Sequence, residues 1–165
     1  MTPVKKNTSI SRRNFVRNAG MVGASFFIVP RHVLGRGFIA PSDKLNIAGI
    51  GVGGKGQSDL FEFAKSPKVN IVALCDVDDR QAVKSREANP KAPYYRDFRE
   101  MLAKEKNNID AVSISTPDHT HAIATLSAMQ LGKHVYTQKP LTHNIYEART
   151  LAQAEQKYKV VTQMG

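Results

Sequence analysis

Residues 45–56 read LNIAGIGVGGKG, an apolar run that changes to a run of glycines within a few positions. The apolar residues predict a short buried strand, and the glycines predict a tight turn directly after it. An amphipathic segment follows, with Leu60, Phe61 and Ala64 on one face, and this spacing predicts a helix. Strand, glycine turn and helix in this order form the unit with which many α/β sheets begin.

The glycines of this turn have the spacing of a phosphate-binding fingerprint, G-x-G-x-x-G. In that pattern the first glycine permits the tight turn, the second lets the backbone approach a pyrophosphate, and the third lets the helix pack closely on the strand. The phosphates would lie on the free N–H groups at the helix N-terminus, where the helix dipole favours negative charge. The predicted phosphate-binding residues are Gly51, Val52, Gly53, Gly54 and Gly56.

Two other interpretations compete with this one. Residues 49–55 also match the frame G-x-x-x-x-G-K of magnesium-dependent phosphate loops, but that frame continues with Ser or Thr and this chain has Gly56. A glycine-rich turn without a ligand is the other alternative. Against it stands a second predicted strand, residues 69–75, which ends at Asp76. A carboxylate about 20 residues beyond the glycines accepts from a ribose hydroxyl in dinucleotide-binding domains, so the two features together favour a dinucleotide.

The basic charge of the chain is concentrated at its N-terminus. The formal net charge is +10, but residues 1–40 carry seven Lys and Arg with no Asp or Glu, and residues 41–165 carry 17 basic and 14 acidic residues. No basic patch is interleaved with aromatic rings, so we expect no nucleic-acid partner. The single cysteine, Cys75, excludes an internal disulfide framework and is expected to be a small core residue.

Residues 1–40 are interpreted as a signal segment and linker. Basic residues precede a mildly apolar run at 19–29, which is too short to span a bilayer. Residues 11–17, with Arg12 and Arg13 paired, resemble the twin-arginine export signal. We therefore expect the twin-arginine machinery as a partner and a periplasmic or cell-envelope location. A basic tail or a transit segment is the alternative, and cleavage near Ala40 or an uncleaved anchor are both open.

The remainder, residues 41–165, alternates strand and helix patterns. Further strands are expected at residues 94–96, 109–115, 134–137 and 160–162, and helices at 78–88, 97–107, 122–131 and 142–157. Such alternation predicts an α/β fold of the Rossmann type, with a doubly wound parallel sheet of six strands. Ligands of these sheets bind beyond the carboxyl ends of the strands. The polar segments 116–121 and 138–140 follow two of those ends, so we expect them at the same site.

At this point the chain resembles a known family. The glycine turn, Cys-Asp-Val-Asp at 75–78, Ser-Thr-Pro-Asp-His-Thr-His-Ala at 115–122 and Tyr-Thr-Gln-Lys-Pro-Leu at 136–141 have the order and spacing of the Gfo/Idh/MocA oxidoreductases. The resemblance runs from about residue 44 to residue 165. The family includes glucose–fructose oxidoreductase, inositol dehydrogenase and NAD-dependent glycosidases.

The resemblance implies roles for individual residues. Asp76 would hold the adenosine ribose and repel a 2′-phosphate, which favours NAD over NADP, although Arg80 close by leaves NADP open. Lys139 would be catalytic, and burial beside a cationic nicotinamide would lower its pKa and suit it to accept a proton. Gln138 replaces the family's usual Glu. The predicted cofactor-binding residues outside the glycine turn are Asp76, Thr116, Pro117, His121, Gln138 and Lys139, and no metal site is expected at His119 and His121.

The family also implies a second domain. Its members continue into a C-terminal α+β domain that supplies a sugar pocket, further acid/base residues and a dimer interface, and this chain reaches Gly165 where that connection begins. We therefore expect a homo-oligomer when full length, and a fragment that binds a dinucleotide better than it turns over a substrate. Three functions remain open: a dehydrogenase of a sugar or cyclitol, a redox-assisted glycosidase or lyase, and a non-catalytic nucleotide-binding module.

Overall fold

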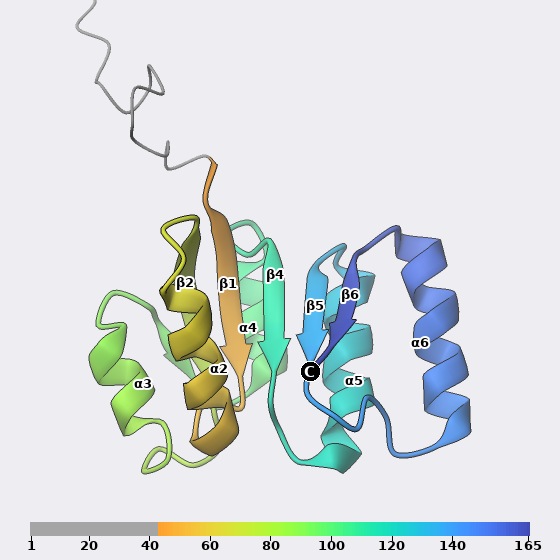
Figure 1. Cartoon of the computed structure of the whole chain (residues 1–165), viewed down its shortest axis with the longest axis horizontal. Coiled ribbons are helices and arrows are strands. Elements are labelled where there is room, and N and C mark those ends of the chain that lie inside the picture. Colours follow the sequence, from red (N-terminus) through yellow and green to blue (C-terminus); the bar gives the residue numbers. More distant parts are fainter. Residues whose placement is uncertain (1–42) are drawn as a thin grey trace, which may run out of the picture. The chain divides into compact units, whose positions relative to one another are not determined.

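The computed structural model describes residues 43–165, and the signal segment predicted for residues 1–40 lies outside them. The described residues form six strands and five helices (Figure 1). None of these helices is both long and apolar enough to cross a membrane. In chain order the elements are β1 (Leu45–Ile50), α2 (Gly54–Ala64), β2 (Val69–Cys75), α3 (Val83–Ala88), β3 (Tyr94–Tyr95), α4 (Phe98–Glu105), β4 (Ala111–Ile114), α5 (Asp118–Gln130), β5 (His134–Thr137), α6 (Ile145–Tyr158) and β6 (Thr162–Met164).

The strands form one parallel sheet in the order β3-β2-β1-β4-β5-β6. This is the strand order of the Rossmann fold, so the predicted doubly wound sheet of six strands is confirmed. The order reverses between β1 and β4, which are hydrogen-bonded neighbours. The loops that leave β1 and β4 therefore diverge from one point at the carboxyl edge and open a crevice there.

Helices cover the two faces of the sheet (Figure 1). Side chains of α4, α5 and α6 pack with Ala48, Ile50 and other inward-facing strand residues in the larger core cluster. A smaller cluster of Val52, Leu60, Leu74 and Ala82 lies under α2 and α3 on the other face. Neighbouring residues of one strand join different clusters because successive side chains of a strand point to opposite faces.

Three helices begin elsewhere than predicted. The helix expected from residue 78 begins at Val83, because Asp78 forms a turn instead: its carbonyl oxygen accepts from the backbone N–H groups of Gln81 and Ala82. The helix expected from residue 122 begins at Asp118, an acidic residue in the first turn of a helix that Pro117 precedes. The helix expected from residue 142 begins at Ile145, after an N-cap.

One backbone conformation and one close approach fix the glycine turn. Gly51 has a φ of +75°, which side chains rarely tolerate, so the turn after β1 requires glycine there. A Cβ atom on Gly56 would overlap the carbonyl oxygen of Gly51. The first turn of α2 therefore packs directly on the backbone at the end of β1, as the G-x-G-x-x-G spacing predicts for its third glycine.

Substitution of Gly56 by Ala should lower the thermal midpoint by about 10 °C, because backbone at Gly51 would have to move at a cost of about 3 kcal/mol. Gly54→Ala is the matched control, since its Cβ would meet no atom within 4 Å and only its φ of +49° is unfavourable. That control should lose about 4 °C, or about 1 kcal/mol. Circular dichroism melts measure both, and equal losses would contradict the close packing of α2 on β1.

Candidate functional site

A cleft of about 590 Å³ lies at the carboxyl edge of the sheet, where the strand order reverses. Its walls come from the loops after β1, β2 and β4 and from the start of α4. Six of the residues predicted from the sequence line it, namely Gly51, Gly53, Gly54, Asp76, Thr116 and Pro117. Segments that are far apart in the sequence thus meet in one cleft.

No side chain caps the N-terminus of α2, which lies at this cleft. Its N-cap residue, Gly53, makes no side-chain cap hydrogen bond, and the first turn holds no acidic residue. Open space adjoins Gly54, where a Cβ would meet nothing within 4 Å. An uncapped helix N-terminus with room beside it suits an anion such as a diphosphate, so the residues of the turn fit the dinucleotide that the sequence predicts.

Asp76 joins the end of β2 to the glycine turn. Its Oδ2 accepts from the backbone N–H of Gly53 at 2.9 Å, and its Oδ1 accepts from the N–H of Asp78 at 3.0 Å. Each carboxylate oxygen has a further lone pair for a ribose hydroxyl.

Cys75, which precedes Asp76, is buried. This burial together with the Asp76 charge raises the pKa of the thiol to about 12. The cysteine is therefore an uncharged wall residue at neutral pH.

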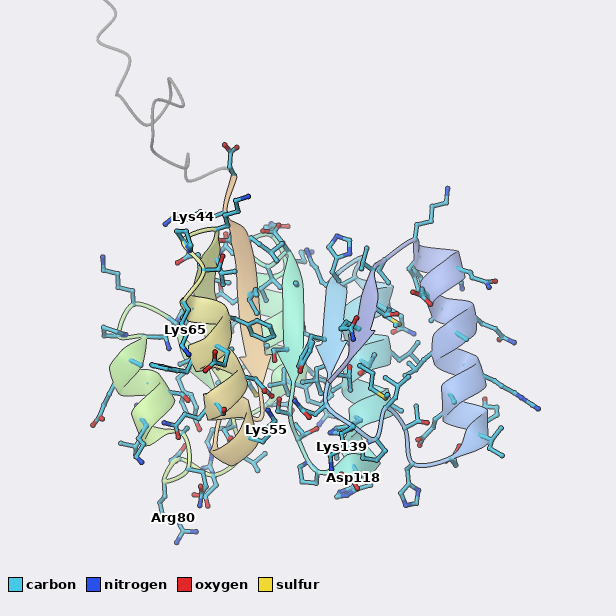
Figure 2. The ribbon with its side chains drawn as sticks, in the orientation of Figure 1. Lys44, Lys55, Lys65, Arg80, Asp118 and Lys139 are labelled. Carbon is cyan, nitrogen blue, oxygen red and sulfur yellow. The ribbon has the colours of Figure 1, made fainter. Side chains whose placement is uncertain are left out.

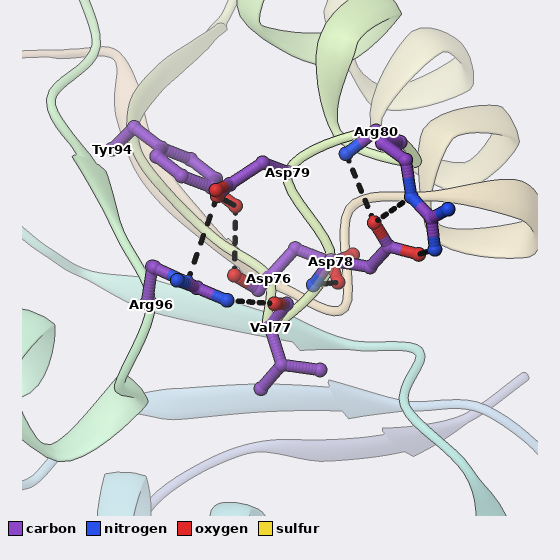
Figure 3. A network of polar contacts seen from close by, with 7 residues as sticks. All are labelled: Asp76, Val77, Asp78, Asp79, Arg80, Tyr94 and Arg96. Atoms are coloured by element: carbon purple, nitrogen blue, oxygen red, sulfur yellow. Dashed lines mark hydrogen bonds and ion pairs between the residues drawn. The ribbon is translucent and has the colours of Figure 1, made fainter.

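Two arginines near Asp76 are engaged by other groups (Figure 3). Arg80 folds back onto Asp78, with its Nε and Nη2 each 3.1 Å from a carboxylate oxygen. Arg96 donates to the carbonyl oxygen of Val77 at 2.9 Å and lies 3.7 Å from the Asp79 carboxylate. At the end of β2, the carboxylates of Asp76, Asp78 and Asp79 therefore outnumber the guanidinium groups of Arg80 and Arg96. The net negative charge disfavours an additional phosphate.

His121 lies behind the cleft rather than in its lining. It is 1 % exposed, and its Nε2 lies 2.7 Å from the carbonyl oxygen of Thr116 and its Nδ1 2.6 Å from that of Pro140. A neutral imidazole carries one N–H and can donate to one of these oxygens, whereas an imidazolium can donate to both. The ring lies between the loop after β4 and the loop after β5 and contacts both, so its geometry is that of a positioning residue.

Gln138 and Lys139 point to opposite sides of the loop after β5. The Gln138 side chain is buried and donates from Nε2 to Asp59 Oδ2 at 3.0 Å. Lys139 is exposed at the carboxyl edge (Figure 2) and is joined to Pro140 by a cis peptide bond. No element of residues 43–165 covers this part of the edge. The expected burial of Lys139 concerns the site with its nicotinamide bound, and it stays a prediction.

Three residues of this region were missed in the sequence. Asp59 and Ser115 contact each other beneath the loops, and Arg96 lines the cleft. A signal for Asp59 existed: it follows Gly56 by three positions and precedes Leu60, so it shares the buried face of α2. No sequence signal marked Arg96, because only the pairing of β3 with β2 places it at the cleft.

Within residues 43–165, no group of three or more His, Cys, Asp or Glu is arranged to hold a metal ion.

Comparison with known proteins identifies the fold and the cofactor. The family described as "Oxidoreductase family, NAD-binding Rossmann fold" (GFO_IDH_MocA) matches residues 45–165. An alpha-N-acetylgalactosaminidase of Shewanella oneidensis is 31% identical over 166 aligned residues, which cover 84% of this chain and 35% of that protein. The chain thus spans about a third of the length of the curated relatives that it matches.

Solved structures agree with this fold. The myo-inositol 2-dehydrogenase of Lactobacillus plantarum superposes with a TM-score of 0.68 at 28% identity, covering 74% of this chain and 36% of that one. GenD2 from gentamicin A biosynthesis, solved in complex with NAD, superposes with a TM-score of 0.68 at 26% identity over 74% of this chain and 34% of its own.

We expect NAD to bind more tightly than NADP by about 100-fold, because Asp76 opposes a 2′-phosphate by about 3 kcal/mol. Asp76→Ala should weaken NAD binding and reduce this ratio, whereas Arg80→Ala should leave the ratio within about twofold, since the guanidinium is turned to Asp78. Calorimetric titration of NAD and NADP into the wild type and the two variants measures all six affinities. A preference for NADP that is lost in Arg80→Ala would instead assign Arg80 to the phosphate.

Proposed function

Because this chain belongs to the Gfo/Idh/MocA oxidoreductases, and residues 45–165 are their NAD-binding Rossmann domain, we propose that it is the cofactor-binding part of an exported enzyme that transfers a hydride to or from a sugar, cyclitol or glycoside. The observation that supports this most is the meeting of the glycine turn, Asp76 and Thr116 in one cleft, with Lys139 at the next strand end. The similar myo-inositol 2-dehydrogenase supports a polyhydroxylated substrate.

In this proposal the N-terminus of α2 holds the pyrophosphate and Asp76 holds the adenosine ribose. Thr116 and Pro117, from the loop after β4, lie along the nicotinamide half. His121 holds that loop against Pro140 through the two carbonyl contacts described above. Gln138 holds the loop after β5 through its buried hydrogen bond to Asp59. The exposed Lys139 is then free to reach a substrate hydroxyl.

Lys139 is the proposed acid/base. When bound, NAD supplies the acceptor for the hydride that leaves a ring carbon of the substrate. The neutral amine of Lys139 takes the proton of the hydroxyl on the same carbon, and it returns that proton when the reaction reverses. Lys139 is exposed in residues 43–165, so exclusion of water from the proton transfer depends on groups outside these residues, the bound cofactor and substrate among them.

A second candidate is a redox-assisted glycosidase or lyase. It is favoured by the alpha-N-acetylgalactosaminidase that is 31% identical to this chain. In this reaction, oxidation at a ring carbon would acidify the adjacent C–H, and elimination would release the leaving group. In a glycosidase, water would then add to the unsaturated ketone, and return of the hydride to the oxidised carbon would complete the reaction. The same residues serve both candidates, because each begins with removal of a hydroxyl proton and a hydride from one carbon.

Export by the twin-arginine route is also part of this proposal. Its support is the sequence of residues 11–17, where Arg12 and Arg13 precede a weakly apolar segment. That route carries folded proteins, and a Rossmann domain that folds around its cofactor before export is compatible with it.

Replacement of Lys139 by Met in the whole protein should lower turnover by about 1,000-fold, because the proton transfer is lost. NADH formation with a panel of cyclitols and sugars measures the first candidate. Exchange of substrate C–H with solvent deuterium, without net NADH, measures the second. Lys133→Met, a surface lysine before β5, is the control, and equal losses in the two variants would exclude the role of Lys139.

The change of Arg12 and Arg13 together to Lys should block export of a folded fluorescent reporter fused after residue 42, because that route requires the arginine pair. Cell fractionation measures the reporter. The matched control is the Lys5 and Lys6 pair changed to Arg, which should leave export unchanged. Export of the Arg12 and Arg13 variant at the unaltered level would contradict the proposed route.

A further inference from the structure

Asp59 is a buried carboxylate on α2 that two loops of the site share. It is 5 % exposed. Its Oδ1 accepts from Lys55 Nζ at 2.6 Å, and its Oδ2 accepts from Ser115 Oγ at 2.8 Å and from Gln138 Nε2 at 3.0 Å. Lys55 lies one turn before Asp59 in α2, Ser115 directly after β4 and Gln138 directly after β5. One side chain of α2 therefore connects the exits of β4 and β5.

The chemistry of Asp59 restricts what can stand at position 138. An ionised carboxylate has no proton to donate, so its oxygens can only accept hydrogen bonds. When it is buried, it stays charged only if donors surround it. The Gln138 amide donates, whereas a Glu at the same position would present a second carboxylate at about 3 Å. The carboxylate on α2 thus accounts for glutamine at a position where the sequence resembles a family that usually has Glu.

The amide of Gln138 is held from a second side. Its Nε2 lies 3.3 Å from the Tyr136 hydroxyl, and the Tyr136 ring packs edge-on against Phe63 of α2 with centroids 5.2 Å apart. The backbone N–H of Gln138 donates to Ile114 at the end of β4 at 2.9 Å. Both the backbone and the side chain of Gln138 are therefore fixed, and Lys139 is the next residue of the chain.

We infer that Asp59 is a positioning residue that orients Gln138, and through it the Lys139–Pro140 loop, and that it dictates glutamine at position 138. The link to Lys139 rests on the function proposed above; the pairing of Asp59 with Gln138 does not. The two parts are separable, because pairing is measured by stability and positioning by cofactor affinity.

The test is an exchange of the two functional groups in the full chain. Gln138→Glu should lower the thermal midpoint by about 10 °C at pH 8, because two buried carboxylates face each other. Such a pair has one pKa raised above its unfolded value, so the variant should be most stable near pH 5 and lose stability as the pH rises to 8. Adding Asp59→Asn to Gln138→Glu restores one amide and one carboxylate. The double variant should recover at least half of the lost midpoint and have no such pH dependence.

Affinity for NAD, titrated by calorimetry at pH 8, tests the positioning. Gln138→Glu should weaken binding by about tenfold, equal to about 1.4 kcal/mol, and the exchanged double variant should recover it. The matched control is Glu62→Gln, which removes an exposed acid from the same helix and should change neither readout.

Losses that add in the double variant, with no recovery, would overturn the pairing. Recovery of stability with NAD affinity unchanged in every variant would overturn the positioning of the Lys139–Pro140 loop. If the wild-type chain binds no NAD and the exchange still restores stability, the proposed function fails and the pairing of Asp59 with Gln138 stands.

Discussion

The packing of the first turn of α2 on the end of β1 governs the rest of this structure. Because Gly56 has no side chain, the helix lies directly on the carbonyl of Gly51. This approach carries the N-terminus of α2 to the cleft, where its N–H groups have no cap. It also carries Asp59, one turn further along, to the exits of β4 and β5. A single steric condition thus sets both the anion-binding end of the cleft and the support beneath its other end.

The charges around the cleft follow a consistent division. The helix N-terminus attracts an anion at the glycine turn, while Asp76 and its acidic neighbours disfavour one at the end of β2. A dinucleotide needs both conditions, since its pyrophosphate is charged and its adenosine ribose in NAD is neutral. Asp76 also accepts from Gly53 in the turn itself, so the two ends of the half-site are positioned relative to each other.

Most of the helices and strands could be predicted from the sequence, because residues close together in the chain determine where such elements form. The segment 134–137 forms a strand at its predicted bounds. Asp97 caps α4, as predicted, by accepting a hydrogen bond from the backbone N–H of Arg99. The start of α3 did not follow from the sequence, because Asp78 can cap a helix or close a turn, and the turn is selected by the position of the glycine loop. The contacts of His121 and Asp59 also did not, since each joins loops that only the completed sheet brings together.

The contrast between locally determined elements and contacts that join distant loops also divides the site. The residues that recognise a dinucleotide are backbone N–H groups and one carboxylate, which the strand–turn–helix unit fixes by itself. The residues that would act on a substrate depend on contacts between distant loops: Lys139 is held by its neighbours Gln138 and Pro140, which are in turn held by Asp59 and His121. Cofactor binding should therefore tolerate changes in this support better than catalysis does, because a proton transfer fails with a displacement that a binding contact can absorb.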